Sequence, residues 1–319
     1  MIVDLEHHFR VAREGVEPKV ERIWADDGVL QYSQGNSGAD VGEHLDFMDG
    51  AGIDVAVLSG NLPNSLSMDA VRTWNDACAK AVSDHPTRFA AFACTKPAGG
   101  DDGFAELTRA INDLGMKGVH INARPGGEFL DSKALWPFYE KCAELDIPID
   151  IHVETYPSGF EALKAPYIMS YVMARELDIT TATVRLCFGG MLEDFPELKI
   201  IVNHFGGGIA AIKDRMDYYV GLCGDDTFNG EALISQDWNH YFDKLYFNMA
   251  GRGPCINTIK CALTCIKPDK LMFGSDWPPN FEVDPSGCKK FIADIRAMDL
   301  PSDDIEAMLG GNAVSMFGL

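Results

Sequence analysis

The chain has 319 residues, of which 46% are hydrophobic and 24% charged, a composition typical of a folded globular protein and not of a disordered one. Its formal net charge of −21 repels phosphate groups, so we expect no nucleic-acid partner. No apolar run is long enough to cross a bilayer, and Met1 leads into a β-type run without a basic or apolar leader, so we expect no membrane association and a cytoplasmic protein.

The nine cysteines are scattered without the paired spacing of a zinc knuckle. Their odd number does not suit a framework of disulfides, so we expect reduced thiols, as in a cytoplasmic protein. Cys261 and Cys265 share a helical spacing, which we interpret as part of an apolar helix and not as a metal site.

Short β-type runs recur along the chain with helical segments between them. Eight runs read as strands: Ile2–Glu6, Asp54–Ser59, Arg88–Thr95, Lys117–Asn122, Ile147–Val153, Leu198–His204, Lys244–Met249 and Leu271–Asp276. The helical segments between them are Asp40–Asp49, Ser67–Asp84, Asp102–Leu114, Ser132–Leu145, Gly207–Val220, Pro254–Ile266 and Pro285–Met298. Strict alternation implies parallel strands with right-handed crossovers, and eight repeats predict an α/β fold, a closed (β/α)₈ TIM barrel.

The strands are continuous apolar runs, as in Lys199–Asn203, which suits strands that are covered on both faces. A doubly wound open sheet is the alternative architecture. It would normally carry a glycine-rich nucleotide turn after its first strand, whereas here the first strand leads into Glu6–Arg10. We find no internal repeat or linker, and therefore expect a single domain over residues 1–319.

Two connections are unusually long, one from Phe9 to Ala39 and one from Glu154 to Glu197. Both leave the carboxyl ends of expected strands, where the active sites of barrel enzymes lie. Long connections at that face often form lids or substrate walls. The second contains a helical segment, Ala165–Leu186, which we expect to cover the pocket.

Polar side chains end four of the expected strands. Strand one ends with Glu6 and His8, which share a face because side chains alternate along a strand. Strands five, six and eight end with His152, His204 and Asp276, so all of these side chains should meet at one face of the barrel. Two imidazoles and two carboxylates can hold a divalent ion with an open position, and mixed nitrogen and oxygen donors suit Zn²⁺, Mn²⁺ or Fe²⁺.

A lone histidine at a strand end is more often a hydrogen-bonded structural residue than a ligand, but this joint placement is hard to explain by chance. The remaining histidines break the pattern. We expect His7 to face the helix layer, His44 and His85 to lie in helices, and His240 to precede strand seven. His120 lies inside strand four, which makes it a weaker candidate for the pocket.

These motifs resemble a known family. Glu6-x-His8, His152, His204 and the ending Gly274–Pro278 look like the amidohydrolase-related group that contains aminocarboxymuconate semialdehyde decarboxylase, in the same order and over nearly the whole chain. The first motif of the family is often His-x-His. Its Glu-x-His form, followed here by Phe, is similar to that of the γ-resorcylate and dihydroxybenzoate decarboxylases.

The resemblance implies one divalent ion, Zn²⁺ or Mn²⁺, bound by Glu6, His8, His152 and Asp276. It places His204 beside the ion as a proton carrier or oxyanion stabiliser, and Asp276 as the residue that handles the proton. We therefore expect His204 and Asp276 to be catalytic. The expected partner is a small carboxylic acid substrate, and the expected assembly is a homo-oligomer, either a dimer or a tetramer.

One departure from the family pattern concerns the residues after His204. The aromatic-acid decarboxylases tend to have a Gly-Glu pair there, whereas this chain has the glycine-rich stretch His204–Gly208, closer to the aminocarboxymuconate enzyme. The usual carboxylate partner of His204 is thus missing from the neighbouring sequence. This absence favours an alternative reaction, hydrolysis of a lactone, amide or thioester, or a hydration.

Three arginines lie just past strand ends, Arg10, Arg124 and Arg252, and each is a candidate clamp for a substrate carboxylate. A salt bridge that braces a loop is an equally good interpretation of each. Phe9 and Trp277 could form an aromatic wall of the substrate pocket, and core packing explains them nearly as well.

Three hypotheses follow. The first is a metal-dependent non-oxidative decarboxylase of a small aromatic or unsaturated carboxylic acid, favoured by Glu6-x-His8 and the arginines. The second is a hydrolase or hydratase, because the same ligand set also activates water. The third, a metal-free binding protein on a barrel scaffold, would make the arrangement of the polar strand ends a coincidence.

Overall fold

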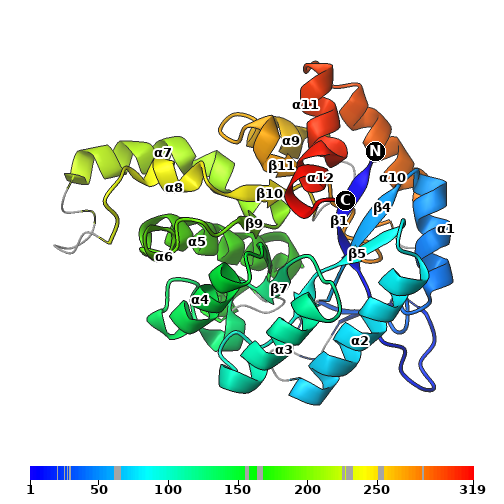
Figure 1. Ribbon diagram of the computed structural model, residues 1–319. Helices are drawn as coiled ribbons and strands as arrows, with labels where there is room; N and C mark the ends of the chain where they lie inside the picture. Colours follow the sequence, from blue (N-terminus) through cyan, green and yellow to red (C-terminus); the bar gives the residue numbers. More distant parts are fainter. Residues whose placement is uncertain are drawn as a thin grey trace.

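The computed structural model describes residues 1–19, 21–24, 26, 28, 30–60, 66–154, 158–163, 168–224, 227, 233–250, 255–281 and 284–319. Parallel strands form a barrel around which the helices are arranged (Figure 1). The barrel strands are β1 (Val3–His8), β4 (Val55–Ser59), β5 (Phe89–Ala91), β6 (Ala93–Cys94), β7 (Val119–Asn122), β8 (Ile149–His152), β9 (Ile200–Val202), β10 (Tyr246–Asn248) and β11 (Leu271–Met272). β1 overlaps its expected segment, Ile2–Glu6, and runs two residues beyond it to His8. Each of the others lies within an expected segment, and the third expected strand is divided into β5 and β6.

Two seams close the barrel. Strands β5 and β6 belong to one extended run that is interrupted at Phe92, whose N–H donates to the carbonyl of Leu58 at 3.0 Å. Strands β1 and β11 meet through the N–H of Leu5, which donates to the carbonyl of Phe273 at 2.9 Å. Because the sheet joins at both places, the strands follow one another in chain order around a closed barrel. The TIM-barrel prediction is confirmed, and the open-sheet alternative is excluded.

Helices cover the outside of this barrel. They are α1 (Val41–Ala51), α2 (Met68–Asp84), α3 (Gly100–Asn112), α4 (Trp136–Glu144), α5 (Arg175–Phe188), α6 (Met191–Asp194), α7 (Ile209–Cys223), α8 (Trp238–Phe242), α9 (Ile256–Ala262), α10 (Pro285–Arg296), α11 (Ser302–Glu306) and α12 (Asn312–Phe317). Capping explains several starts: Ser67 accepts from the N–H of Ala70 at α2, and Asp284 accepts from Ser286 at α10. Within the part of the chain that the structure describes, no helix is long and apolar enough to cross a membrane.

The two long connections contain more structure than the sequence indicated. The first carries an antiparallel hairpin of β2 (Glu21–Trp24) and β3 (Leu30–Ser33), which was not predicted. In the second, a π-helical turn at Ser170–Ala174 leads directly into α5, which ends at Phe188. Helix α5 packs against the turn that follows β9, so its amino-terminal end lies at the carboxyl face of the barrel.

An apolar plug fills the amino-terminal half of the barrel. It is a cluster of buried side chains from the strands and from the last helix: Val3, Leu5, Val57, Ala90, Phe92, Ile201, Met272, Ala313 and Phe317. Phe317 closes the plug at the amino-terminal end of the barrel, with its ring edge-on to Phe92 at 5.4 Å between centroids. The chain termini lie side by side at this end (Figure 1). Polar chemistry is therefore confined to the opposite, carboxyl-terminal half.

Replacing Phe317 by Ala should lower the free energy of unfolding by about 3 kcal/mol, because a buried aromatic ring is removed from a closed apolar cluster. Urea unfolding followed by circular dichroism measures the change. The matched control is Ser315→Ala, an exposed position on the same helix, which should change stability little. Equal stability of the two variants would show that the last helix does not seal the barrel.

Candidate active site

The carboxyl ends of the strands bring four side chains to one point. Glu6, His8, His152 and Asp276 are all buried, and one ligand-type atom of each lies within 4.8 Å of the others. His152 Nε2 lies 3.1 Å from Glu6 Oε1, and His8 Nε2 lies 3.0 Å from Asp276 Oδ1. The structure thus places together the four residues that the sequence suggested as metal ligands.

A bulge in β1 directs the side chains of Glu6 and His8 toward this point. The register between β1 and β4 shifts between Asp4 and His7. Leu5 belongs to the apolar plug, and Glu6 next to it nevertheless reaches the polar cluster. His7 faces the helix layer, as expected, and stacks on Trp277 at 4.8 Å between ring centroids. The extra residue turns two consecutive side chains inward and re-aims the end of the strand.

Asp4 joins β1 to the segment that follows β11. Its carboxylate accepts from His7 Nδ1 at 2.8 Å, from the N–H of Ser275 at 2.7 Å and from the hydroxyl of Ser275 at 2.6 Å. Asp276 follows with a positive φ of 56°, and its Oδ2 accepts from Asn280 Nδ2 at 3.0 Å. These bonds fix the position of Asp276 relative to β1.

The two imidazoles are oriented by hydrogen bonds at their Nδ1 atoms. His152 Nδ1 lies 2.8 Å from the carbonyl of Val153, so it donates there and leaves Nε2 as a lone-pair atom. His8 Nδ1 lies 3.3 Å from the hydroxyl of Ser59. Both rings therefore turn Nε2 toward the carboxylates, the orientation that metal binding requires.

Electrostatics favour a cation at this point. Burial raises the pKa of Glu6 well above its usual value, and the nearby carboxylates of Asp276 and Asp150 raise it further. Burial also lowers the pKa of His152 well below its usual value, with smaller contributions from neighbouring positive groups. Among the described residues, Glu6 Oε1, His152 Nε2 and His204 Nε2 are buried without a hydrogen-bond partner. These orphaned donor atoms fit a divalent ion, which would complete their coordination.

His204 lies beside the four-residue cluster, with Nε2 at 3.8 Å from Glu6 Oε1. Its Nδ1 lies 3.0 Å from Oε1 of Glu176, the second residue of α5. The sequence next to His204 lacks the usual carboxylate partner, and α5 supplies one from a distant part of the chain. No pattern next to His204 could have revealed it.

The charges of two arginines act on the imidazoles of the cluster. Burial lowers the pKa of His8, and Arg10 adds a small contribution in the same direction. Burial also lowers the pKa of Arg10 itself to about 10, with a smaller contribution from Arg13, and Arg10 Nη2 donates to the side-chain oxygen of Gln34. Arg175, the first residue of α5, contributes in the same way to the low pKa of His152. The Nε atoms of Arg10 and Arg175 are buried and lack a hydrogen-bond partner within the described ranges. The sequence analysis identified Arg10 and missed Arg175, because Arg175 follows no strand.

The other two candidate arginines differ from these. Arg124 pairs with the buried carboxylate of Asp178 at 2.6 Å and lies over the ring of Phe129 at 3.7 Å, which is the loop-bracing role weighed from the sequence. Its charge is thus already compensated by α5, and we no longer assign it to the substrate. Arg252 lies outside the described residues.

The two aromatic candidates lie behind β1 and not at the cluster. Phe9 packs edge-on against Trp74, and its carbonyl accepts from the indole N–H of that residue at 3.0 Å. Trp277 stacks between His7 and Phe47 and is 3% exposed. We therefore assign both to packing between the barrel and the helix layer. This is the alternative interpretation that the sequence analysis gave for them.

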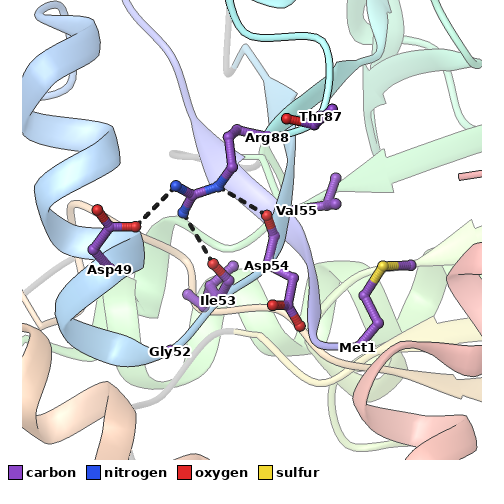
Figure 2. Close-up of a pocket in the computed structure, with 8 residues that line it drawn as sticks. All are labelled: Met1, Asp49, Gly52, Ile53, Asp54, Val55, Thr87 and Arg88. Atoms are coloured by element: carbon purple, nitrogen blue, oxygen red, sulfur yellow. Dashed lines mark hydrogen bonds and ion pairs between the residues drawn. The ribbon is translucent and has the colours of Figure 1, made fainter.

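A wide depression of about 750 Å³ lies at the opposite, amino-terminal face, beside the beginnings of β1, β4 and β5. Figure 2 shows how its charged groups are used: Arg88 pairs with Asp49 at 2.8 Å and donates to the carbonyls of Ile53 and Asp54. Because its arginine is fully engaged in bracing α1 against the sheet, this face is structural.

A barrel with histidines and carboxylates at the carboxyl ends of β1, β8, β9 and β11 defines a class of metal-dependent enzymes. The amidohydrolase family model matches residues 8–319, and the chain belongs to this family. The resemblance noted in the sequence is therefore confirmed.

Individual relatives differ in their reactions. A γ-resorcylate decarboxylase from Polaromonas sp. is 26% identical over 73% of this chain and 75% of its own length. A 2-keto-4-carboxy-3-hexenedioate hydratase from Sphingobium sp. is 26% identical over 99% of this chain and 96% of its own. The crystal structure of a dihydroxybenzoic acid decarboxylase from Polaromonas sp., with bound manganese and 2-nitroresorcinol, superimposes with a TM-score of 0.79 at 23% identity and covers 100% of this chain and 97% of that chain.

Proposed function

We propose that this protein is a metal-dependent non-oxidative decarboxylase of a small aromatic or unsaturated carboxylic acid. The observation that carries the proposal is the pairing of two features at one point. A cluster of metal-ligating side chains has unpartnered atoms, and the guanidinium groups of Arg10 and Arg175 flank it. A carboxylate substrate satisfies both features, because it can bind to a cation and accept from an arginine.

Glu6, His8, His152 and Asp276 are the residues that would hold the ion. A divalent ion bound there supplies a Lewis acid, which stabilises the negative charge that develops as carbon dioxide leaves. Nitrogen and oxygen donors in this ratio suit Mn²⁺ and Zn²⁺, and the manganese of the dihydroxybenzoic acid decarboxylase leads us to propose Mn²⁺ first.

The protein's own groups manage the proton. Decarboxylation breaks the bond between the carboxyl carbon and the substrate, leaves the electron pair on the substrate carbon, and requires one proton at that carbon. We assign this proton to the carboxyl group of Asp276, which Asn280 holds at 3.0 Å. His204, oriented by Glu176, presents Nε2 to the same space and can stabilise or return a proton there.

A hydratase is the second candidate. It is favoured by the relative from Sphingobium sp., which aligns with 99% of this chain. The same ligand set can activate water, and His204 with Glu176 can take up its proton. The finding that Glu176 supplies the carboxylate partner removes the argument from sequence against a decarboxylase, and this is why we place decarboxylation first.

The metal assignment predicts a specific loss. His152→Ala should remove most of the bound Mn²⁺ or Zn²⁺, because a buried ligand atom is deleted from a set of four. Inductively coupled plasma mass spectrometry of the purified variants measures the metal content. The matched control is His240→Ala, at an exposed position away from the cluster, which should retain about one ion per chain. Full occupancy in His152→Ala would defeat the ligand assignment.

The reaction itself is tested by a screen. Protein loaded with Mn²⁺ or Zn²⁺ is incubated with hydroxylated benzoates, unsaturated dicarboxylates and small lactones, and the products are identified by mass spectrometry. We expect a product that has lost the mass of carbon dioxide and none that has gained water. A gain of water on an unsaturated or lactone substrate, with no loss of carbon dioxide, would replace the decarboxylase by the second candidate.

Glu176→Gln should lower kcat by about tenfold to a hundredfold and leave KM nearly unchanged, because Gln keeps a hydrogen-bond acceptor for His204 but not its charge. Steady-state kinetics on the substrate found in the screen, together with metal content, give the comparison. Glu161→Gln, an exposed position in the same connection, is the matched control. A rise in KM with unchanged kcat would show that Glu176 serves substrate binding and not His204.

A further inference from the structure

A second polar pair lies inside the barrel next to the proposed metal site, and no role has been assigned to it so far. His120 on β7 and Asp150 on β8 are direct neighbours across the parallel ladder. His120 Nδ1 lies 2.6 Å from Asp150 Oδ2, and the two residues are 3% and 0% exposed. The ring of His120 lies 5.3 Å from that of His152, between centroids. The sequence analysis ranked His120 as a weak candidate, and the structure places it beside a proposed ligand.

The Nε2 atom of His120 faces away from Asp150 and can accept a hydrogen bond. A carboxylate only accepts hydrogen bonds, so Nδ1 of His120 carries the proton of the 2.6 Å bond, and in this tautomer Nε2 presents a lone pair. Nε2 is buried, and nothing among the described residues donates to it. A buried acceptor without a donor is costly, so this atom calls for a group that brings its own proton.

A small cavity lies beside His120 at the carboxyl ends of β4, β6 and β7. Its lining residues are Gly60, Cys94, Thr95, Pro97, His120, Ile121, Asn122 and Pro125. Its volume is about 20 Å³, enough for one water-sized group and too small for a carboxylate or a ring.

We infer that His120, held by Asp150, and the cavity beside it form a subsite that binds one hydroxyl group of the substrate. A hydroxyl has the right size for the cavity and donates to Nε2, which has no other donor. The inference rests on the proposed function, because it places the subsite next to the ion that would bind the carboxylate. It narrows the substrate class to hydroxylated acids, aromatic or unsaturated.

The competing interpretation is a purely structural pair whose cavity holds a water. The two differ in what a substitution does to different ligands. A structural pair would affect all ligands alike, whereas a subsite affects only those that carry the recognised hydroxyl. A comparison of ligands that differ by one hydroxyl therefore separates them.

The test uses His120→Asn. Asn keeps an N–H near the position of Nδ1, which can still donate to Asp150, but it has no atom at the position of Nε2. The double variant His120→Phe/Asp150→Leu removes both polar partners together and serves as a second test if the first is unstable. The matched control is His240→Asn, the same substitution at an exposed histidine away from the barrel interior.

Binding to the Mn²⁺-loaded full-length protein is measured by isothermal titration calorimetry. The probes are 2-hydroxybenzoate and the dihydroxybenzoates that add one hydroxyl to it. We expect the wild-type protein and His240→Asn to bind at least one dihydroxybenzoate roughly tenfold more tightly than 2-hydroxybenzoate. His120→Asn should bind the same pair with nearly equal affinity, with its metal content and melting temperature close to wild type.

Several outcomes overturn the inference. It fails if the preference persists in His120→Asn and in the double variant, or if wild-type protein shows no preference for any dihydroxybenzoate. It fails together with the aromatic-acid proposal if wild-type protein binds none of the probes. The decarboxylase proposal fails separately when the preference is present and sensitive to His120 but no carbon dioxide is released from any probe.

Discussion

The buried carboxylate of Glu6 is the constraint on which the rest of this site depends. It is 0% exposed, and burial together with Asp276 and Asp150 raises its pKa well above the usual range. One of its oxygens accepts from Asn248 at 2.7 Å, and the other has no hydrogen-bond partner within the described residues. Desolvated acidic groups this close together repel one another unless a cation lies among them. The imidazole Nε2 atoms that face the same point are the donors that such a cation needs.

The polar cluster and the apolar residues that stabilise the barrel occupy opposite halves of its interior. The amino-terminal half of the interior is an apolar plug closed by Phe317. Leu5 is the last residue of β1 in this plug, and the next residue, Glu6, already belongs to the polar cluster. The bulge in β1 makes this abrupt change possible, because it turns both Leu5 and Glu6 inward. Hydrogen bonds that Asp4 accepts from His7 and Ser275 then hold the polar end in place without help from the cluster itself.

The alternation of strands and helices, and the polar residues at the strand ends, could be predicted from the sequence. Glu6, His8, His152 and Asp276 could be found because parallel strands deliver their last residues to one face. Arg175 and Glu176 could not, since they begin a helix in a long connection and only tertiary packing brings them to the cluster. His120 was undervalued for a different reason: a position inside a strand says little about depth in the barrel. The roles of these residues, the resident metal and the oligomeric state stay predictions.

The connection that carries α5 explains how one ligand cluster can serve more than one reaction. Three polar residues lie in the first turn of α5: Arg175 acts on His152, Glu176 contacts His204, and Asp178 pairs with Arg124. In the proposed function the strand ends would hold the ion, whereas this helix places Glu176 next to His204 and Arg175 near His152. A change in the connection could therefore redirect the proton without disturbing the ligands. The decarboxylase and the hydratase among the relatives differ in reaction, and α5 is where this chain offers a physical basis for such a difference.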